Sequence, residues 1–328
     1  MMNKRERLEK TLQGEATDRV PVALWRHWPG DDQRAADLAR ATIDFQKTYD
    51  WDFVVVTPAN TAFVTDYSLQ SEWLGDLQGH RQIVKPVIRR SLQWTELRVL
   101  DPMRGELGKY LNAINLVEVA LPEDTPVLAV LHSPLMQAAM LAEGTLMFQH
   151  MRTQADRLRT GLNTLTENLL TFLTALRRTT IAGVLYMMPN ADYGVLSLEE
   201  YRSFGEPYDR KILEAVPSKW WLNMVHLGVG EAPMFDLAAR YPAQVLNWVD
   251  GEPDLERAKT LSSGALWAGL NAQQHVHLGT PSIVQDAARS AVTRAGSRRL
   301  ILGASSAVPT SAPLSNLRAV RDSVEGLF

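Results

Sequence analysis

"IAGVLYMMPNADYGVLSLEEYRSF", residues 181–204, contains one complete unit of the fold that this sequence predicts. Its first seven residues, 181–187, form a continuous apolar run, which is typical of a strand buried on both faces. A polar loop follows, and Ser197 and Glu200 then have the spacing of a capping box at the start of a helix over 197–204. A strand, a loop and a helix in this order indicate a parallel α/β sheet.

The same unit recurs along the chain. Eight short apolar runs are separated by segments with helical periodicity, and most runs are continuous rather than alternating. This pattern predicts an α/β fold, a (β/α)8 TIM barrel, and we expect a single barrel domain over residues 1–328. The predicted strands are 21–25, 52–57, 126–131, 181–187, 220–225, 244–249, 264–270 and 299–303.

Helical patterns lie between these runs. Besides 197–204, helices are predicted over 34–48, 155–177, 280–292 and 312–324. Thr280 is the expected N-cap of the helix over 280–292, with Pro281 at its first position.

The segment 59–125 is too long for a simple crossover between strands 2 and 3. Its part 86–102, "PVIRRSLQWTELRVLDP", contains apolar residues at a spacing that suggests a β-hairpin. We therefore expect an inserted β-hairpin excursion here.

Composition excludes several classes of function. The chain has 328 residues, a formal net charge of -3 and no cysteine, so no basic surface indicates nucleic-acid binding and no thiolate or disulfide chemistry is possible. The N-terminus is charged and resembles no signal peptide, and no apolar run is long enough to span a membrane. We expect a cytoplasmic protein.

Polar residues follow the predicted strands, at the barrel end where loops carry chemistry. Five of the seven histidines belong to this group, whereas His80 and His150 do not. We expect one cavity to be lined by Arg26, His27, Asn60, His132, Asp192, His226, Asp250 and His275. The candidates are Arg26, His27 and Trp28 after strand 1, Asn60, His132, Asp192 and Tyr193, His226, Asp250, and Asn271, His275 and His277.

Each candidate also has a structural interpretation. Trp28 could pack against its loop, His132 could bond to backbone, and one of His275 and His277 could face solvent. Arg26 ends a buried strand, where an unpaired charge is costly, so it either pairs with a protein acid or awaits an acidic ligand. No nucleotide, zinc-protease or nucleophile-elbow motif is present, which leaves charge recognition with acid/base chemistry, or a His/carboxylate metal site.

The order of several stretches resembles the uroporphyrinogen decarboxylase superfamily, which includes corrinoid-dependent methyltransferases. The resemblance runs nearly end to end and implies a (β/α)8 barrel, often dimeric, with its pocket at the carboxyl-terminal mouth. The stretches that carry it are "RERLEKTLQGEATDRVPVALWRH" (5–27), "SPLMQAAMLAEG" (133–144), "LSLEEYRSFGEPYDRKIL" (196–213), "HLGTPSIVQDAARSAV" (277–292) and "GASSAVPTSAPLSNLRAV" (303–320).

The motifs of the two branches are only partly kept. Of the arginine-rich decarboxylase stretch after strand 1, only Arg26 matches, and no acid stands at Val56-Thr57-Pro58, where the decarboxylases carry an aspartate. Tyr193 corresponds to the family tyrosine beyond strand 4. Of the zinc ligands of the methyltransferases, only His226 matches, since Gly228 and Ala304 stand at the two cysteine positions.

We therefore expect an enzyme, a carboxy-lyase-like protein that decarboxylates a carboxylated small molecule or performs related acid/base chemistry without a cofactor or tightly bound zinc. Arg26 would anchor a carboxylate, because its planar fork matches that group. His226 would transfer the proton, oriented by Asp250 or Asp192. Asp31 and Asp32 would limit the number of carboxylates. The alternatives are a corrinoid- or metal-linked methyltransferase and a non-catalytic ligand-binding barrel; a homodimer is possible.

Overall fold

The computed structural model describes residues 2–325. Its centre is a curled sheet of seven parallel strands, in the order β1-β4-β5-β6-β7-β8-β9. Each strand is buried along almost its whole length, which explains why the strands appear in the sequence as continuous apolar runs. The strands are β1 (Val54–Val56), β4 (Val127–His132), β5 (Gly183–Met187), β6 (Met224–His226), β7 (Val245–Asn247), β8 (Ala265–Leu270) and β9 (Leu300–Ala304).

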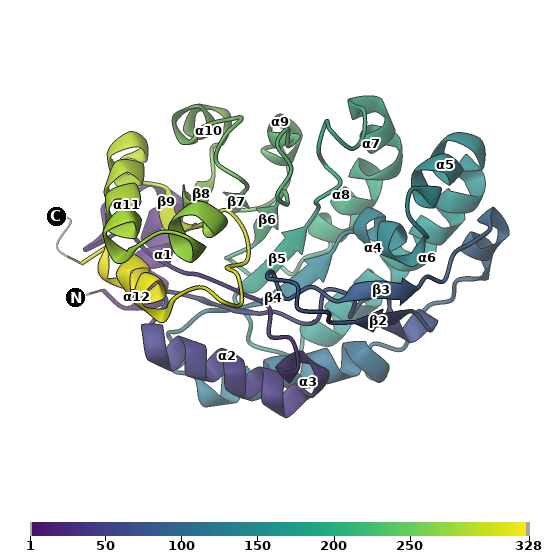
Figure 1. Ribbon diagram of the computed structural model, residues 1–328, viewed down its shortest axis with the longest axis horizontal. Helices are drawn as coiled ribbons and strands as arrows, with labels where there is room; N and C mark the ends of the chain where they lie inside the picture. The colour runs from purple at the N-terminus through teal and green to yellow at the C-terminus, as the bar shows by residue number, and fades with distance from the viewer. Residues whose placement is uncertain (1, 326–328) are drawn as a thin grey trace.

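Helices surround the sheet, with α2 and α3 on one side and α7 to α10 on the other (Figure 1). Among the described residues, no helix combines the length and the apolar character needed to cross a membrane. The helices are α1 (Lys4–Gln13), α2 (Ala35–Tyr49), α3 (Gly105–Ala120), α4 (Pro134–Leu141), α5 (Leu146–Thr153), α6 (Ala155–Leu176), α7 (Leu198–Phe204), α8 (Glu206–Glu214), α9 (Phe235–Ala238), α10 (Leu255–Leu261), α11 (Pro281–Ala295) and α12 (Leu314–Asp322).

The predicted helix signals are confirmed. Ser197 and Glu200 form the capping box at the start of α7, and the side chain of Thr280 caps α11, which begins at Pro281. These local signals work because the first turn of a helix has N–H groups without partners in the helix itself.

The predicted first strand, 21–25, is not a regular strand. It forms a single parallel bridge, between Val22 and Leu302 of β9, and the carbonyl of Val22 accepts a hydrogen bond from the N–H of Asp52 just before β1. The segment therefore lies between β9 and the start of β1. Regular pairing fails because Pro21 has no N–H and because the N–H of Val22 donates to the carboxylate of Asp52.

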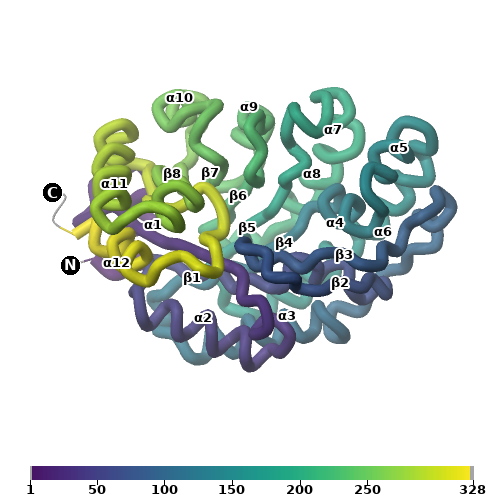
Figure 2. Tube along the Cα trace, in the orientation of Figure 1, coloured from purple at the N-terminus to yellow at the C-terminus, as the bar shows by residue number. Residues whose placement is uncertain are grey.

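The prediction of a β-hairpin at 86–102 is wrong. This segment contains a short helical turn, Ser91–Glu96, and an antiparallel ribbon of β2 (Gln70–Glu72) and β3 (Gln82–Lys85) lies earlier in the same excursion. Trp94, one of the apolar residues that suggested a strand, is buried against α5 and α6, where its indole N–H donates to His150. Figure 2 shows the excursion running beside β4 and α4.

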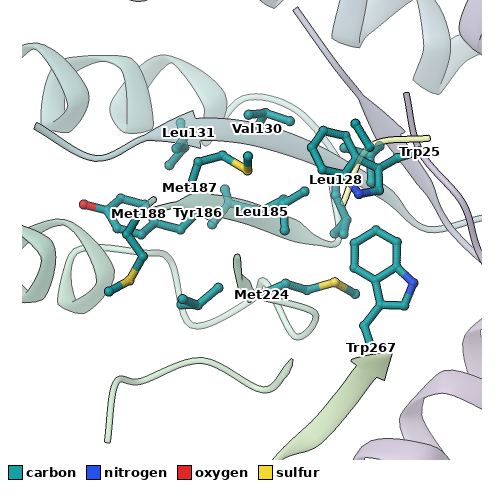
Figure 3. Packing of buried hydrophobic residues seen from close by; sticks show 14 of the residues in the cluster. Trp25, Leu128, Val130, Leu131, Leu185, Tyr186, Met187, Met188, Met224 and Trp267 are labelled. Atoms are coloured by element: carbon teal, nitrogen blue, oxygen red, sulfur yellow. The ribbon is translucent and has the colours of Figure 1, made fainter. Parts of the chain in front are cut away.

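The core of the sheet is filled by large side chains. Figure 3 shows Trp25 and Trp267 beside Leu128 and Met224, whereas Tyr186 points its hydroxyl away from them. That hydroxyl donates to the buried carboxylate of Asp209 on α8.

Candidate functional site

A row of side chains crosses the carboxyl-terminal ends of four neighbouring strands. The pairing places His132 of β4 level with Met187 of β5, Met187 level with His226 of β6, and His226 level with Asn247 of β7. Level residues of parallel strands point to the same face of a sheet. The row therefore brings two of the predicted histidines to one end of the fold.

His226 is held in one orientation by Asn247. The ring nitrogen Nδ1 of His226 lies 2.5 Å from the side-chain oxygen of Asn247. The amide nitrogen of Asn247 donates to the carbonyls of Trp267 (2.6 Å) and Ala304 (3.0 Å), so its oxygen is left to accept. Nδ1 of His226 must therefore carry the proton and Nε2 carries the lone pair.

The imidazole of His226 is neutral. Burial lowers its pKa to about 4, against a smaller opposing effect of the hydrogen bond to Asn247. Nε2 forms no hydrogen bond to any residue in the described part of the chain. A neutral imidazole with a free lone pair can accept a proton from a ligand.

The ring of Trp25 lies close to both His27 and His226. The indole ring of Trp25 lies 5.7 Å from the ring of His226 and 5.8 Å from that of His27. The ring of His80 packs edge-on against that of His27, with 4.8 Å between the ring centroids. Burial, with smaller contributions from His80 and His132, lowers the pKa of His27 well below its usual range.

His132 lies in an apolar environment. Its ring packs 4.8 Å from that of Phe63, and its buried Nδ1 has no protein partner among the described residues. Burial lowers its pKa to about 3. His27, His132 and His226 are therefore three buried, neutral imidazoles, and together with His80 we call them the histidine cluster.

We call residues 73–81, between β2 and β3, the strap. Asn60 holds its end, since both side-chain amide atoms bond to the backbone of Arg81. The carbonyl of Leu77 accepts hydrogen bonds from Thr310, on the loop after β9. Gly79 lies so close to His27 that an added Cβ would be 2.7 Å from the Cβ of His27. The strap therefore lies over His27, and Asn60 positions it.

The side chain of Arg26 contacts Thr310 and Trp28. Its Nη2 donates to the carbonyl of Thr310 at 2.7 Å, and its guanidinium lies over the indole of Trp28 at 4.9 Å. Trp28 packs against Phe45 of helix α2 rather than against its own loop. Within residues 2–325, no carboxylate pairs with Arg26.

Asp192 and Asp250 do not orient His226, and this part of the prediction is wrong. The carboxylate of Asp192 accepts hydrogen bonds from the backbone N–H groups of Gly194 and Ala232, so it joins two loops. Asp250 pairs with Arg294 of α11. Nδ1 of His226 bonds to Asn247 instead.

The predicted residues after β8, Asn271, His275 and His277, hydrogen-bond within their loop or to Ser311. The side-chain oxygen of Asn271 caps the turn at Gln273 and Gln274, and Nδ1 of His275 accepts from the N–H of Asn271. Nε2 of His277 bonds to Ser311.

Three further predicted residues lie outside the histidine cluster. Tyr193 is half exposed and lines a separate surface cavity with Phe235 and Arg257. Asp31 pairs with Arg40, and Asp32 is buried with one oxygen bonded to Gln33. Neither acid pairs with Arg26.

Two residues of the site, Asn247 and His80, were not among the candidates predicted from the sequence. Asn247 stands inside the apolar run 244–249, where a single buried amide was the available signal. His80 follows no parallel strand and reaches His27 only because the strap folds back.

The parallel sheet with helices around it, and the polar residues at its carboxyl-terminal end, define a TIM-barrel-like α/β protein with a buried histidine cluster. The chain belongs to the uroporphyrinogen decarboxylase family, whose model matches residues 34–327.

Two uroporphyrinogen decarboxylases are similar to this chain in sequence. Uroporphyrinogen decarboxylase of Xylella fastidiosa is 26% identical over 305 residues, which cover 86% of this chain and 85% of that protein. The enzyme of the same name from Syntrophotalea carbinolica is 25% identical over 214 residues, or 62% and 60% of the two chains.

A methyltransferase from Methanosarcina mazei has the same fold, with a TM-score of 0.86 at 17% identity over 98% of this chain and 99% of that one. A B12-independent methionine synthase from Shewanella sp. W3-18-1 is more distant, with a TM-score of 0.59 at 14% identity over 92% of each chain. At these identities the two structures support the fold alone.

Proposed function

We propose that this protein is an enzyme that decarboxylates a small carboxylated molecule, or moves a proton in a closely related reaction, at the carboxyl-terminal end of its sheet. The observation that carries the proposal is the pair of His226 and Asn247, because it fixes a buried neutral imidazole with Nε2 free. A pKa lowered by burial beside a group that sets the tautomer is typical of catalytic acid/base residues. As part of the same proposal, segment 21–25 completes the sheet as an eighth strand of a (β/α)8 barrel.

The chemistry assigns a sequence of roles to these side chains. Decarboxylation breaks the bond between the carboxylate carbon and its neighbour; carbon dioxide leaves, and the electron pair stays on the neighbouring carbon. That carbon then takes a proton, which His226 donates from Nε2. His226 must first gain this proton, since it is neutral at rest.

The negative charge of the substrate supplies the reason for this gain. A carboxylate close to the imidazole favours its protonated form, so the pKa of His226 rises when the substrate binds. Binding below neutral pH is therefore accompanied by proton uptake.

Arg26 is the proposed anchor of the substrate carboxylate. It is half buried and carries a charge that no carboxylate of the described residues balances. A guanidinium binds a carboxylate through two parallel hydrogen bonds, from Nη1 and Nη2 or from Nε and Nη2. Here Nη1 and Nε have no protein partner, and Nη2 has a second hydrogen besides the one that it donates to Thr310.

Zinc-dependent methyl transfer fits these residues less well. Of the expected ligand positions only His226 carries a ligating side chain, since Gly228 and Ala304 occupy the others. Within residues 2–325, no three His, Cys, Asp or Glu side chains are grouped closely enough to hold a metal ion.

The test uses a panel of mono-, di- and polycarboxylates with the purified protein. We measure carbon dioxide release in heavy water, deuterium at the carbon that lost the carboxylate, and binding heat in two buffers of different ionisation enthalpy. The expected result is turnover of a small carboxylate, with proton uptake on binding.

The variant His226→Gln keeps a polar side chain but cannot transfer the proton. We expect its turnover to fall about 100- to 10,000-fold, the usual contribution of a positioned proton-transfer group. His277→Gln is the matched control, since His277 bonds to Ser311 and has no contact with the cluster. Full turnover in His226→Gln would contradict the proposal, and binding without turnover in the wild type would favour a non-catalytic ligand-binding barrel.

A further inference from the structure

Three imidazoles of the histidine cluster are closed off from solvent in this structure. His27, His132 and His226 expose only 4%, 2% and 2% of their surface. A small organic ligand is bound over most of its own surface, so it reaches these rings only when a covering segment moves away. The strap, residues 73–81, is the segment that covers His27, because its His80 packs against the ring of His27.

The strap rests on the rest of the molecule at Gly79, which is its only buried residue. A Cβ added to Gly79 would lie 2.7 Å from the Cβ of His27. The same Cβ would lie 3.2 Å from side-chain carbons of Pro29 and Thr310. The strap therefore reaches its seat on His27 only because position 79 has no side chain.

Little apolar surface holds the strap down. Its large apolar residues Trp73, Leu74 and Leu77 are 42%, 66% and 48% exposed. Hydrophobic stabilisation grows with the apolar area removed from water, so side chains exposed to this extent add little to the seated position. Segments with few buried apolar contacts open at a low cost in free energy compared with the core of a protein.

The strap is a turn closed on itself by Asp76. The carboxylate of Asp76 accepts hydrogen bonds from the backbone N–H groups of Gln78 (2.9 Å) and His80 (3.0 Å). Its carbonyl accepts from the N–H of Gly79 (2.9 Å) and from the indole of Trp73 (3.2 Å). Because both partners of each bond belong to the strap, the turn keeps its shape when it lifts and moves as one unit.

One residue outside the strap holds its middle. The backbone N–H of Thr310 (2.7 Å) and its hydroxyl (3.2 Å) both donate to the carbonyl of Leu77. The carbonyl of the same Thr310 accepts from Nη2 of Arg26 at 2.7 Å. Thr310 therefore links the position of the strap to the orientation of the guanidinium.

We propose that the strap is a lid that lifts to admit a ligand to the buried imidazoles, and that Thr310 is its latch. With the strap seated, Leu77 fixes Thr310, which positions Arg26. With the strap lifted, Thr310 loses Leu77, and the guanidinium loses its fixed partner. The role of Arg26 rests on the proposed function, whereas the lifting of the strap does not.

The first test follows the backbone amide of Thr310 in the full chain without ligand, by hydrogen exchange with nuclear magnetic resonance. We expect this amide to exchange by a local opening whose rate does not change with low concentrations of urea, because lifting the strap exposes little surface. The amides of β4, in the core, should exchange through a larger opening that urea accelerates.

Two glycine variants separate the seat from the rest of the strap. Gly75 and Gly79 have φ angles of 86° and 80°, so alanine pays the same backbone strain at either position. Only the alanine at 79 meets His27, since a Cβ at 75 has no atom within 4 Å. We expect the amide of Thr310 to exchange about 10-fold faster in Gly79→Ala than in the matched control Gly75→Ala.

Carboxylate binding tests the link to Arg26. Gly79→Ala should weaken the binding of the carboxylate panel more than Gly75→Ala does. In the double variant with Arg26→Lys the two losses should not add, because both affect the same interaction. Additive losses would mean that Thr310 does not position Arg26.

Two results would overturn the lid. One is exchange of the Thr310 amide in the wild type with the same urea dependence as the amides of β4, which decides the matter even if Gly79→Ala does not fold. The other is an equal exchange rate in the two glycine variants. If no carboxylate binds while Thr310 exchanges by local opening, the proposed function fails and the lid stands.

Discussion

The buried ionisable groups at the two ends of the sheet differ in the partners that the protein gives them. Next to the amino-terminal end, the fully buried carboxylate of Asp52 accepts hydrogen bonds from Arg7 (2.6 Å), Arg19 (2.6 and 3.1 Å) and the backbone N–H of Val22 (2.7 Å). At the carboxyl-terminal end, His132 and Arg26 keep buried nitrogens without protein partners.

The two ends of the sheet also differ in whether buried charges have a partner of opposite charge. Asp52 is balanced by two arginines, and Arg7 is balanced a second time by Asp18, whose pKa its hydrogen bond lowers to about 2. At the mouth, burial keeps the imidazoles of His27, His132 and His226 neutral, and Arg26 has no carboxylate partner.

The comparison separates residues that stabilise the fold from residues available to a ligand. A buried group whose bonds are all made within the protein contributes to stability and cannot bind anything else. A buried group with a free donor or acceptor destabilises the empty protein and gains its partner from a ligand. Substitutions at the two ends should therefore change different quantities.

The largest expected effect is at Asp52. The variant Asp52→Asn leaves Arg7 and Arg19 without their shared counter-charge, and breaking a buried pair in this way costs about 3–5 kcal/mol of unfolding free energy. Urea denaturation measures it. Asp124→Asn, at an exposed acid near the same end, is the control and should stay within about 0.5 kcal/mol of wild type. Equal stability of both variants would remove the distinction between the ends.

The next effect is at Arg26. Lysine keeps the charge but loses the fork, so Arg26→Lys should weaken carboxylate binding by about 1.5–3 kcal/mol. Calorimetry with the mono-, di- and polycarboxylate panel measures it, and Arg40→Lys, at an exposed arginine of α2, serves as control. Unchanged affinity, or tightest binding of the polycarboxylates, would mean that Arg26 has only a structural role.

Asn247 should have a smaller effect that is visible in the pH profile. Asn247→Ala releases Nδ1 of His226, and loss of such an orienting group typically costs about 10- to 100-fold in activity. The profile of kcat/KM against pH should shift, because the hydrogen bond to Asn247 raises the pKa of His226. A lower rate with an unchanged profile would indicate a purely structural role.

The last effect, which builds up gradually with falling pH, is the pH dependence of stability. His132 has an ordinary pKa of 6.5 in the unfolded chain and about 3 in the folded one, so the unfolded state binds the extra proton between these values. Its contribution to stability is complete above pH 6.5 and is lost as the pH falls, by at most about 1.4 kcal/mol per pH unit. His132→Phe should have a flatter curve between pH 6.5 and 4.5 in urea titrations. Parallel curves would show that His132 is solvated.

The same division explains what the sequence could predict. Strands β4, β5 and β8 were found because burial on both faces leaves an apolar run, and α7 and α11 because their caps are local. The misplaced hairpin at 86–102 failed because Trp94 is buried by α5 and α6, which lie far along the chain.

In the site, His27, His132 and His226 could be predicted because each follows a predicted strand. Their hydrogen-bond partners could not be predicted in this way. Asp192 and Asp250 bond to Ala232 and Arg294, residues that only the folded chain brings near. The partner of His226 is an amide inside an apolar run, and nothing local distinguishes Asn247 from any buried polar residue.

The most direct test of the difference between the two ends is the protonation state of His226 in solution. Nuclear magnetic resonance of protein labelled with ¹⁵N-histidine, with His226→Gln to assign the signals, reports both ring nitrogens. We predict that at pH 7 His226 is neutral, with the proton on Nδ1 and none on Nε2, and that it does not titrate between pH 8 and 5 without ligand. A protonated imidazolium at pH 7, or a proton on Nε2 instead of Nδ1, would contradict the account.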